Sequence, residues 1–188
     1  MVYEDKKAWL NELQMLEKHD HIDLFYGDQS GFCLTPVMAY CWQYPKEQVR
    51  MLAQKSKRVN VFGLLSGGKK LVTFIKEGSL KADFIVDSID GWAKTLTRPT
   101  VLVLDNAPVH QAKLLQASLA EWEQQNLFIF FLPTYSPHLN KIEHVWRKIK
   151  YEWLRPESYL SLEILKAALS NIFEQFGHRY LINFKQHL

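Results

Sequence analysis

The stretch TVLVLDNAPVH, residues 100–110, decides the fold that this sequence predicts. Its four consecutive apolar residues, 101–104, are typical of a central β-strand that is covered on both faces. Asp105 follows at the carboxyl end of this strand, where the chemistry of open α/β sheets gathers. Pro108 suits the first position of a helix, because its missing N–H needs no partner there. A single Asp after a strand is as often a turn or helix-capping residue as a functional one, so the other segments must decide.

The composition limits the class of protein. The chain has 188 residues, of which 47% are hydrophobic and 13% aromatic, which suits one domain with a full core and excludes a disordered chain. No apolar run reaches membrane-spanning length and the N-terminus lacks a signal-peptide pattern, so we expect a soluble, cytoplasmic protein. Cys33 and Cys41 have neither CxxC spacing nor histidine partners, which predicts free, buried thiols.

The charges are unevenly distributed, although the formal net charge is only +3. Residues 1–28 carry three Lys against seven Asp or Glu, whereas residues 45–81 carry nine Lys or Arg against two acids. Residues 141–155 carry five Lys or Arg against two acids. A basic run is often only a solvated face. Beside clustered carboxylates, however, such runs also suit a polyanion that metal ions help to hold.

The first half of the chain predicts a helix and three antiparallel strands. Residues 4–18 place Trp9, Leu13 and Leu16 at helical spacing. Residues 22–26 form an apolar strand, and Asp28 follows it as Asp105 follows its own strand. Residues 58–65 and 70–75 are β-rich, and the Ser-Gly-Gly sequence between them is typical of a hairpin turn.

Helices and strands alternate in the second half. Apolar spacing predicts helices over residues 80–96 and 108–125 and a buried strand over 127–132. A loop with two prolines leads to a helix that begins near Asn140, and a last amphipathic helix covers residues 161–176. A strand, helix and strand at this spacing imply a parallel pair with a right-handed crossover. The sequence therefore predicts an α/β protein of the ribonuclease H-like fold, a mixed five-stranded sheet with helices on both faces.

This fold would bring three acidic residues together. The first and fourth strands are neighbours at the centre of such a sheet, so Asp28 and Asp105 would lie side by side. Glu143, in the first turn of the helix after the fifth strand, would close the site. Glu143 also has a structural interpretation, because Asn140 followed by Glu143 is a capping-box arrangement and a first-turn Glu suits the helix dipole.

Three segments of the sequence resemble a known family. They are LFYGDQSGF (24–32), VLVLDNAPVHQAK (101–113) and LPTYSPHLNKIEHVWRKIK (132–150). They are similar to the catalytic blocks of the IS630 group of transposases, in the IS630/Tc1/mariner superfamily, and the third block is the most specific. The resemblance spans about residues 22–154 and implies a DDE endonuclease domain. It implies that Asp28, Asp105 and Glu143 are the catalytic triad and the metal ligands, with Mg²⁺, or Mn²⁺ in its place, as the cofactor.

The chemistry of carboxylates supports this assignment. Three convergent carboxylates raise each other's pKa unless divalent cations neutralise them, and hard oxygen ligands suit Mg²⁺ or Mn²⁺. Two such ions stabilise the attacking and leaving oxygens of an in-line phosphoryl displacement. We therefore expect metal-dependent cleavage of phosphodiester bonds at transposon ends, then strand transfer of the 3′-OH ends into target DNA. A TA target site is implied by the resemblance alone.

Basic residues near these blocks are candidates for DNA contacts. Arg147 and Lys150 share the helix face of Glu143, and phosphate contacts of this kind are salt-sensitive. The full set of candidates is Lys57, Arg58, Lys141, Arg147 and Lys150. All five could equally be ordinary surface charges. His110 and His138 lie near two of the blocks, and we expect them to be structural rather than catalytic.

The sequence departs from the family pattern in three respects. Gln29 and Lys141 stand where many relatives have Glu and Pro, and neither is a proposed ligand, so we expect activity to be retained. Relatives carry helix-turn-helix DNA-binding domains before the catalytic domain, and the residues ahead of the first strand are too few to hold one. We therefore expect residues 1–20 to be a linker helix and residues 21–188 to be the catalytic domain with a C-terminal helix.

Such a chain would be a truncated copy, an isolated catalytic half or the second product of a split reading frame. The expected partners are transposon ends, target DNA, further copies in a homodimer or larger assembly on DNA, and a helix-turn-helix domain upstream or on a separate polypeptide. The expected location is the nucleoid of a prokaryotic cell. Two alternative functions stay open: an inactive remnant that serves as an assembly or regulatory subunit, and a nonspecific metal-dependent nuclease.

Overall fold

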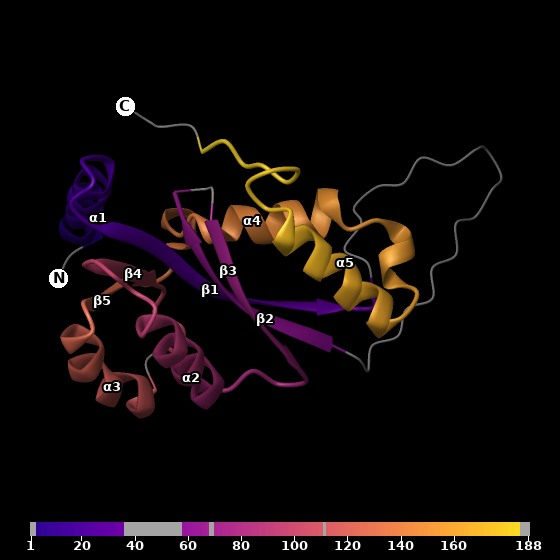
Figure 1. The fold of residues 1–188 in the computed structure, drawn as a ribbon, viewed down its shortest axis with the longest axis horizontal. Coiled ribbons are helices and arrows are strands. Elements are labelled where there is room, and N and C mark those ends of the chain that lie inside the picture. Colours follow the sequence, from indigo (N-terminus) through magenta and orange to yellow (C-terminus); the bar gives the residue numbers. More distant parts are fainter. Residues whose placement is uncertain (1–2, 36–57, 68–69, 111, 185–188) are drawn as a thin grey trace.

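Five strands form one mixed sheet (Figure 1). The computed structural model describes residues 3–35, 58–67, 70–110 and 112–184. The strand order is β3-β2-β1-β4-β5, with β1–β2 and β2–β3 antiparallel and β1–β4 and β4–β5 parallel. The bounds are β1 Asp23–Cys33, β2 Arg58–Ser66, β3 Lys70–Glu77, β4 Thr100–Leu104 and β5 Leu127–Phe131. The predicted ribonuclease H-like sheet, with the first and fourth strands as neighbours, is confirmed.

Helices cover both faces of this sheet, as predicted (Figure 1). The α-helices are α1 Tyr3–Lys18, α2 Ala82–Ala93, α3 Lys113–Gln124, α4 Ile142–Lys148 and α5 Leu162–Glu174. A π-helical turn, Ile149–Trp153, continues α4, and 3-10 turns span Pro137–Leu139 and Pro156–Tyr159. Helices α2 and α3 share one core with Leu102 and Leu104, whereas α4 and α5 share the other with Val101 and Val103. Within the described residues, no helix has the length and apolar character needed to cross a membrane.

Helix α1 packs on the sheet through fewer apolar residues than the sequence predicts. Its only buried residue is Leu10, and Leu13 packs at the edge of the same core. Trp9 and Leu16 are exposed, so the predicted stripe was partly wrong. A polar contact completes the packing, because the amide of Gln14 donates to the Tyr26 hydroxyl at 2.8 Å.

Strand β1 is longer than the sequence predicts, and this changes the position of Asp28. The sequence predicts a strand that ends before Asp28, whereas β1 continues to Cys33 and holds Asp28 in its middle. The glycines that suggest a turn lie instead where neighbouring side chains approach the strand closely. A Cβ at Gly27 would lie 2.7 Å from Leu104 Cδ2, and a Cβ at Gly31 would overlap the guanidinium of Arg58. Close approach of neighbouring side chains is a common reason for glycine within a strand.

The segment after β4 also differs from the prediction. Helix α3 begins at Lys113, not at Pro108, because residues 107–110 turn back toward Asp105. Strand β5 was predicted to be buried, yet it lies at the edge of the sheet and most of it is only half-buried. The thiol of Cys33 is free and half-buried. Cys41, Lys57, Gly68 of the hairpin turn and the basic segment 45–57 lie outside the described residues.

Candidate active site

The two aspartates lie at the same level of the sheet. In the parallel pairing of β1 and β4, Tyr26 is opposite Val103. Continuing this register by two residues brings Asp28 level with Asp105, directly after the end of β4. The fold therefore brings these two carboxylates together, as the sequence predicts, although one lies within a strand and the other follows one.

Asp28 is buried, with 7% of its surface exposed. The indole Nε1 of Trp146 donates to its Oδ2 at 3.1 Å, and the backbone N–H of Gln29 donates to the same carboxylate. Burial and, next, the negative charge of Glu143 raise the pKa of Asp28 well above its usual value, and Asp105 adds to the effect. These hydrogen bonds offset only part of it. The net effect of this environment is to favour the protonated form of the Asp28 carboxyl.

Gly63 makes room for the indole that reaches Asp28. It is the partner of Asp28 in the antiparallel register of β1 and β2. A Cβ at Gly63 would lie 2.6 Å from Cη2 of Trp146 and 3.0 Å from Cδ1 of Ile142. The absence of a side chain here lets α4 lie close to the middle of the sheet.

Glu143 reaches the site because α4 is attached to β1 just before Asp28. The side chain of Asn140, which is 1% exposed, donates from Nδ2 to the carbonyl oxygen of Gly27 at 3.0 Å. Its Oδ1 has no partner among the described residues, and no side chain caps α4. The capping-box interpretation of Asn140 and Glu143 is therefore wrong. Asn140 fixes the beginning of α4 to the strand that carries Asp28.

Asp105 has a different environment. Its Oδ1 accepts from the backbone N–H of Ala107 at 3.0 Å and lies 2.6 Å from Nδ1 of His110. Burial, the largest influence, raises the pKa of Asp105, but the bonds to His110 and Ala107 together outweigh it and leave the pKa below its usual value. His110 is fully buried, and its Nε2 has no partner in the described part of the chain. His138 differs, because it is exposed and bonds to the Tyr3 hydroxyl at 2.9 Å.

Four of the five candidate DNA contacts fall within the described residues. Lys150 is half-buried, with its Nζ 5.4 Å from the centre of the Phe32 ring. Burial lowers the pKa of Lys150, and the negative charges of Glu143 and Asp28 raise it again in part. The Lys150 ammonium therefore lies close enough to interact with these two carboxylates. Arg58 lies against Gly31, three residues after Asp28. Arg147 is exposed, whereas Lys141 is half-buried over the ring of Tyr26, 5.2 Å from its centre.

The donor atoms suit a hard divalent cation. Asp28, Asp105 and Glu143 supply carboxylate oxygens, which Mg²⁺ and Mn²⁺ prefer, and their mutual repulsion raises the pKa of Asp28. Across the described ranges, no three His, Cys, Asp or Glu side chains already converge as a complete metal site. The combined negative charge of the three residues fits a divalent cation.

Comparison with known proteins agrees with this geometry. The sequence profile of the family described as DDE superfamily endonuclease matches residues 23–166, which include all three carboxylates. The chain belongs to this DDE family. The match ends beyond α4, so it covers the whole sheet of this DDE domain and the helix that carries Glu143.

Individual relatives of this DDE domain are transposon proteins. It is 23% identical over 129 residues to an uncharacterized 39 kDa protein of insertion element IS630 from Shigella sonnei, covering 67% of this chain and 37% of the relative. It is 25% identical over 151 residues to the Tcb2 transposase of Caenorhabditis briggsae, covering 77% and 52%. The chain thus spans about half or less of each of these relatives.

Solved structures of the Mos1 mariner transposase share the fold. The Mos1 strand transfer complex aligns with a TM-score of 0.62 at 17% identity, over 93% of this chain and 54% of the Mos1 chain. Mos1 paired-end complexes with Mn and with Mg align with TM-scores of 0.60 and 0.61, at 18% and 14% identity, over 90% and 95% of this chain and 52% and 58% of theirs.

Several residues of the site could not be assigned from the sequence. The sequence assigns Trp146 to the apolar side of its helix and Gly63 to a strand, without linking either to Asp28. Their roles depend on the contact between α4 and β2, which are distant in the sequence. One signal was present, because glycine in the middle of an apolar strand indicates that another group approaches closely.

Proposed function

We propose that this chain is the catalytic domain of a DDE transposase. It would cleave phosphodiester bonds at transposon ends in a metal-dependent reaction and transfer the 3′-OH ends into target DNA, at TA sites. The observation that carries the proposal is the coupling of three carboxylates around one buried position: Glu143 and Asp105 both raise the pKa of Asp28. A buried carboxylate beside two others is costly to ionise unless it serves a ligand, and functional sites concentrate such groups.

Asp28, Asp105 and Glu143 would hold two Mg²⁺ ions, or Mn²⁺ in their place. The bound ions would supply a lowered pKa for water and charge neutralisation at the phosphate. The chain's own residues set the geometry. Trp146 and Asn140 fix the positions of Asp28 and of α4, and His110 orients Asp105 through its bond to Oδ1. The complexes of Mos1 with Mn and with Mg support this choice of ions.

Arg58, Lys141, Arg147 and Lys150 are our proposed DNA contacts, together with Lys57. Lys150 is the best supported of these candidate contacts, because its half-buried ammonium interacts electrostatically with Glu143 and Asp28. An ammonium at that position can bind the phosphate that flanks the reacting one. Arg58 would extend the same positive region along β1.

The remaining expectations about organisation are also proposals. We assign residues 1–20 to a linker helix and residues 21–188 to the catalytic domain. We propose that transposon ends and target DNA are its partners, that it acts as a homodimer or larger assembly on DNA, and that a helix-turn-helix domain, upstream or separate, supplies end recognition. We also propose that it acts in the nucleoid of a prokaryotic cell.

Cleavage of supercoiled plasmid DNA tests the proposal. The wild-type chain and Asp105→Asn are compared with Mg²⁺, with Mn²⁺ and with EDTA. Metal-dependent nicking that disappears in Asp105→Asn is the expected result. A second assay supplies an oligonucleotide with a free 3′-OH transposon end and scores its joining to plasmid. Cutting without joining would replace the transposase by a nonspecific nuclease.

If no cleavage is observed, metal binding is measured instead, because end recognition by the proposed additional domain would be missing from this chain. Calorimetry with Mn²⁺ compares the wild-type chain with Asp105→Asn. Binding that is lost in the variant supports the metal site. Equal heats for both proteins would contradict the catalytic assignment and favour the inactive remnant.

A further inference from the structure

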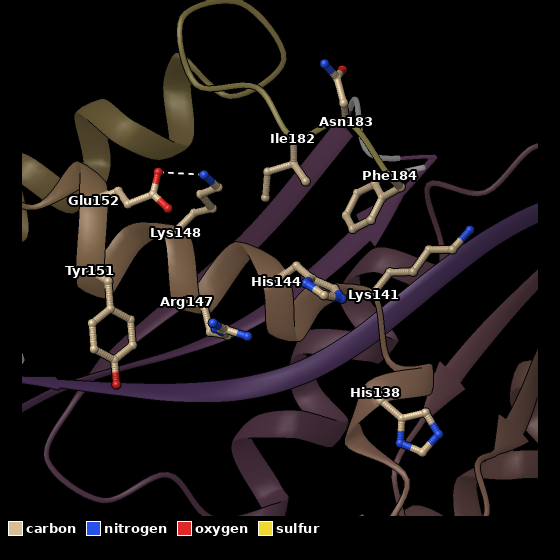
Figure 2. Close-up of a pocket in the computed structure, with 10 residues that line it drawn as sticks. All are labelled: His138, Lys141, His144, Arg147, Lys148, Tyr151, Glu152, Ile182, Asn183 and Phe184. Carbon is tan, nitrogen blue, oxygen red and sulfur yellow. Dashed lines mark hydrogen bonds and ion pairs between the residues drawn. The ribbon is translucent and has the colours of Figure 1, made fainter. Parts of the chain in front are cut away.

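A pocket of about 580 Å³ lies on the side of α4 that faces the C-terminal segment (Figure 2). Its volume is in the range of about 300–1,000 Å³ that is usual for ligand sites. One wall is α4 with the turn that follows it, and the other is formed by residues 182–184 (Figure 2). Its lining residues are His138, Lys141, His144, Arg147, Lys148, Tyr151, Glu152, Ile182, Asn183 and Phe184.

The lining has an excess of positive charge, and one cation in it is available. Lys148 is paired with Glu152 at 2.5 Å. The positive charge of Lys141 lies over the Tyr26 ring and interacts with Glu17. Arg147 is exposed and forms no ion pair with any described residue. A guanidinium in this state suits a phosphate, which it can bind through two parallel hydrogen bonds.

Aromatic rings stand beside this guanidinium. Tyr151 is 55% exposed, and the exposed ring of His144 meets the Phe184 ring edge-on, with 5.9 Å between centroids. Figure 2 shows His144 between Arg147 and Phe184. Rings next to a cation are the features that bind unpaired nucleotides, because a base stacks on the ring while the cation holds its phosphate.

The location links the pocket to the carboxylates. Arg147 comes one turn after Glu143, so the two residues are about 6 Å apart along the helix axis. Successive phosphates of one DNA strand are about 3.4 Å apart along the helix axis when the bases are stacked. The spacing is larger in an unstacked, extended strand, where it approaches the distance between Glu143 and Arg147. A strand that places one phosphate at Glu143 would therefore reach Arg147 within one or two nucleotides.

We propose that this pocket binds a single unpaired nucleotide of the DNA strand next to the cleaved bond. Arg147 holds its phosphate, and the rings of His144 and Tyr151 hold its base. The inference rests on the proposed function for the identity of the strand, but the binding itself needs neither metal nor cleavage. It adds His144 and Tyr151 to the residues that contact DNA and assigns them to unpaired rather than duplex DNA.

Fluorescence anisotropy in EDTA tests the proposal with two labelled DNAs, a blunt duplex and the same duplex with a short single-stranded overhang. The wild-type chain should bind the overhang DNA more tightly. His144→Ala combined with Tyr151→Ala should weaken binding of the overhang DNA about tenfold, since stacking contributes about 1–3 kcal/mol per base. Binding of the blunt duplex should be unchanged. His19→Ala, an exposed histidine at the end of α1, is the control, and thermal melting checks that each variant is folded.

Three results of the anisotropy titrations would overturn the inference, and one result of a competition experiment would do so too. They are equal affinity of the wild-type chain for both DNAs, an unchanged preference in the double variant, and an equal loss for both DNAs. Displacement of the overhang DNA by a polyglutamate peptide at the same concentration as by an oligonucleotide would favour a protein ligand and overturn it as well. Its failure is separable from failure of the proposed function. Cleavage that persists without the preference contradicts the pocket alone, and a preference without metal-dependent cleavage contradicts the function alone.

Discussion

Asp28 and Asp105 lie level with each other on neighbouring strands, yet their environments differ in almost every respect. Asp28 lies within a strand, is buried, and has a pKa that burial and two other carboxylates raise. Asp105 follows its strand, its side chain is 37% exposed, and bonds from His110 and Ala107 lower its pKa. Two carboxylates in one site therefore have opposite electrostatic requirements. Burial and the neighbouring carboxylates favour the protonated form of Asp28, whereas the bonds from His110 and Ala107 favour the ionised form of Asp105.

This difference suggests a division of labour. Asp105 would supply a permanent negative charge that attracts the first cation. A cation held by the three carboxylates would favour the ionised form of Asp28, so metal affinity should rise with pH chiefly through this residue. The predictions below test this contrast, beginning with the largest expected effect.

Removing either charge should abolish cleavage, however much the two environments differ. We expect Asp28→Asn and Asp105→Asn each to lower metal-dependent nicking about 10³-fold or more, because residues that act as a unit fail together. The measurement is the initial nicking rate of supercoiled plasmid. Asp87→Asn, at an exposed position on α2, removes an acid outside the site and should leave the rate unchanged. More than a tenth of the wild-type rate in either variant would show that its carboxylate is dispensable.

Removing the indole N–H that donates to Asp28 should lower the cleavage rate less than removing either carboxylate, because it affects only the positioning of Asp28. Trp146→Phe keeps a ring in the core but deletes the N–H that bonds to Oδ2. We expect cleavage to fall about 10–100-fold, the usual cost of losing a residue that orients a metal ligand. Trp153→Phe is the matched control, since this indole packs against Phe176 and Tyr180 away from the carboxylates. Equal rates for the two variants would mean that the bond to Asp28 has no part in positioning it.

Filling the space opposite Asp28 should lower stability. In Gly63→Ala the new Cβ meets Trp146 at 2.6 Å, so the indole and α4 must move. Overpacking of this kind costs about 1–3 kcal/mol of unfolding free energy, measurable by urea denaturation. Gly91→Ala is the control, because a Cβ there meets nothing within 4 Å and alanine stabilises a helix by about 0.5–1 kcal/mol. No loss of stability in Gly63→Ala would show that α4 can shift freely.

The smallest and most direct test is the pH dependence of stability in EDTA. The folded protein holds the Asp28 proton more tightly than the unfolded chain, so above the usual carboxyl pKa of about 4 the unfolding free energy falls as pH rises. For Asp105 the folded pKa is lowered, so its stabilisation is present above about pH 4 and is lost as pH falls further.

The two Asn variants should therefore change stability in opposite directions at pH 7. We expect Asp28→Asn to stabilise the metal-free protein by about 1 kcal/mol and Asp105→Asn to destabilise it by about 1 kcal/mol, the latter because the bond to buried His110 is weakened at a partly exposed site. Denaturation curves between pH 3 and pH 8 would check both signs. Shifts of the same sign would remove the contrast between the two aspartates.

The sequence predicts one half of this contrast better than the other. Strand β4 and the carboxylate after it follow from a local pattern, a short apolar run that ends in Asp105. The location of Asp28 within β1 depends on tertiary packing, because Gly27 and Gly31 are typical of a turn until the side chains that fill their Cβ positions are known. Asn140 gave the same difficulty, since its local capping pattern competes with a bond to Gly27, which is distant in the sequence.

One contact at the far edge of the sheet has a consequence for the behaviour of the protein in solution. Strand β5 is an edge strand, and Phe128 on it is 43% exposed. The ammonium of Lys6, on α1, donates to the carbonyl oxygen of Phe131 at 2.7 Å at the end of that strand. A lysine at a sheet edge opposes the addition of a strand from another molecule. Lys6 of helix α1 therefore blocks pairing of another strand with this end of β5. We expect a chain shortened past Lys6 to aggregate more readily through its β5 edge.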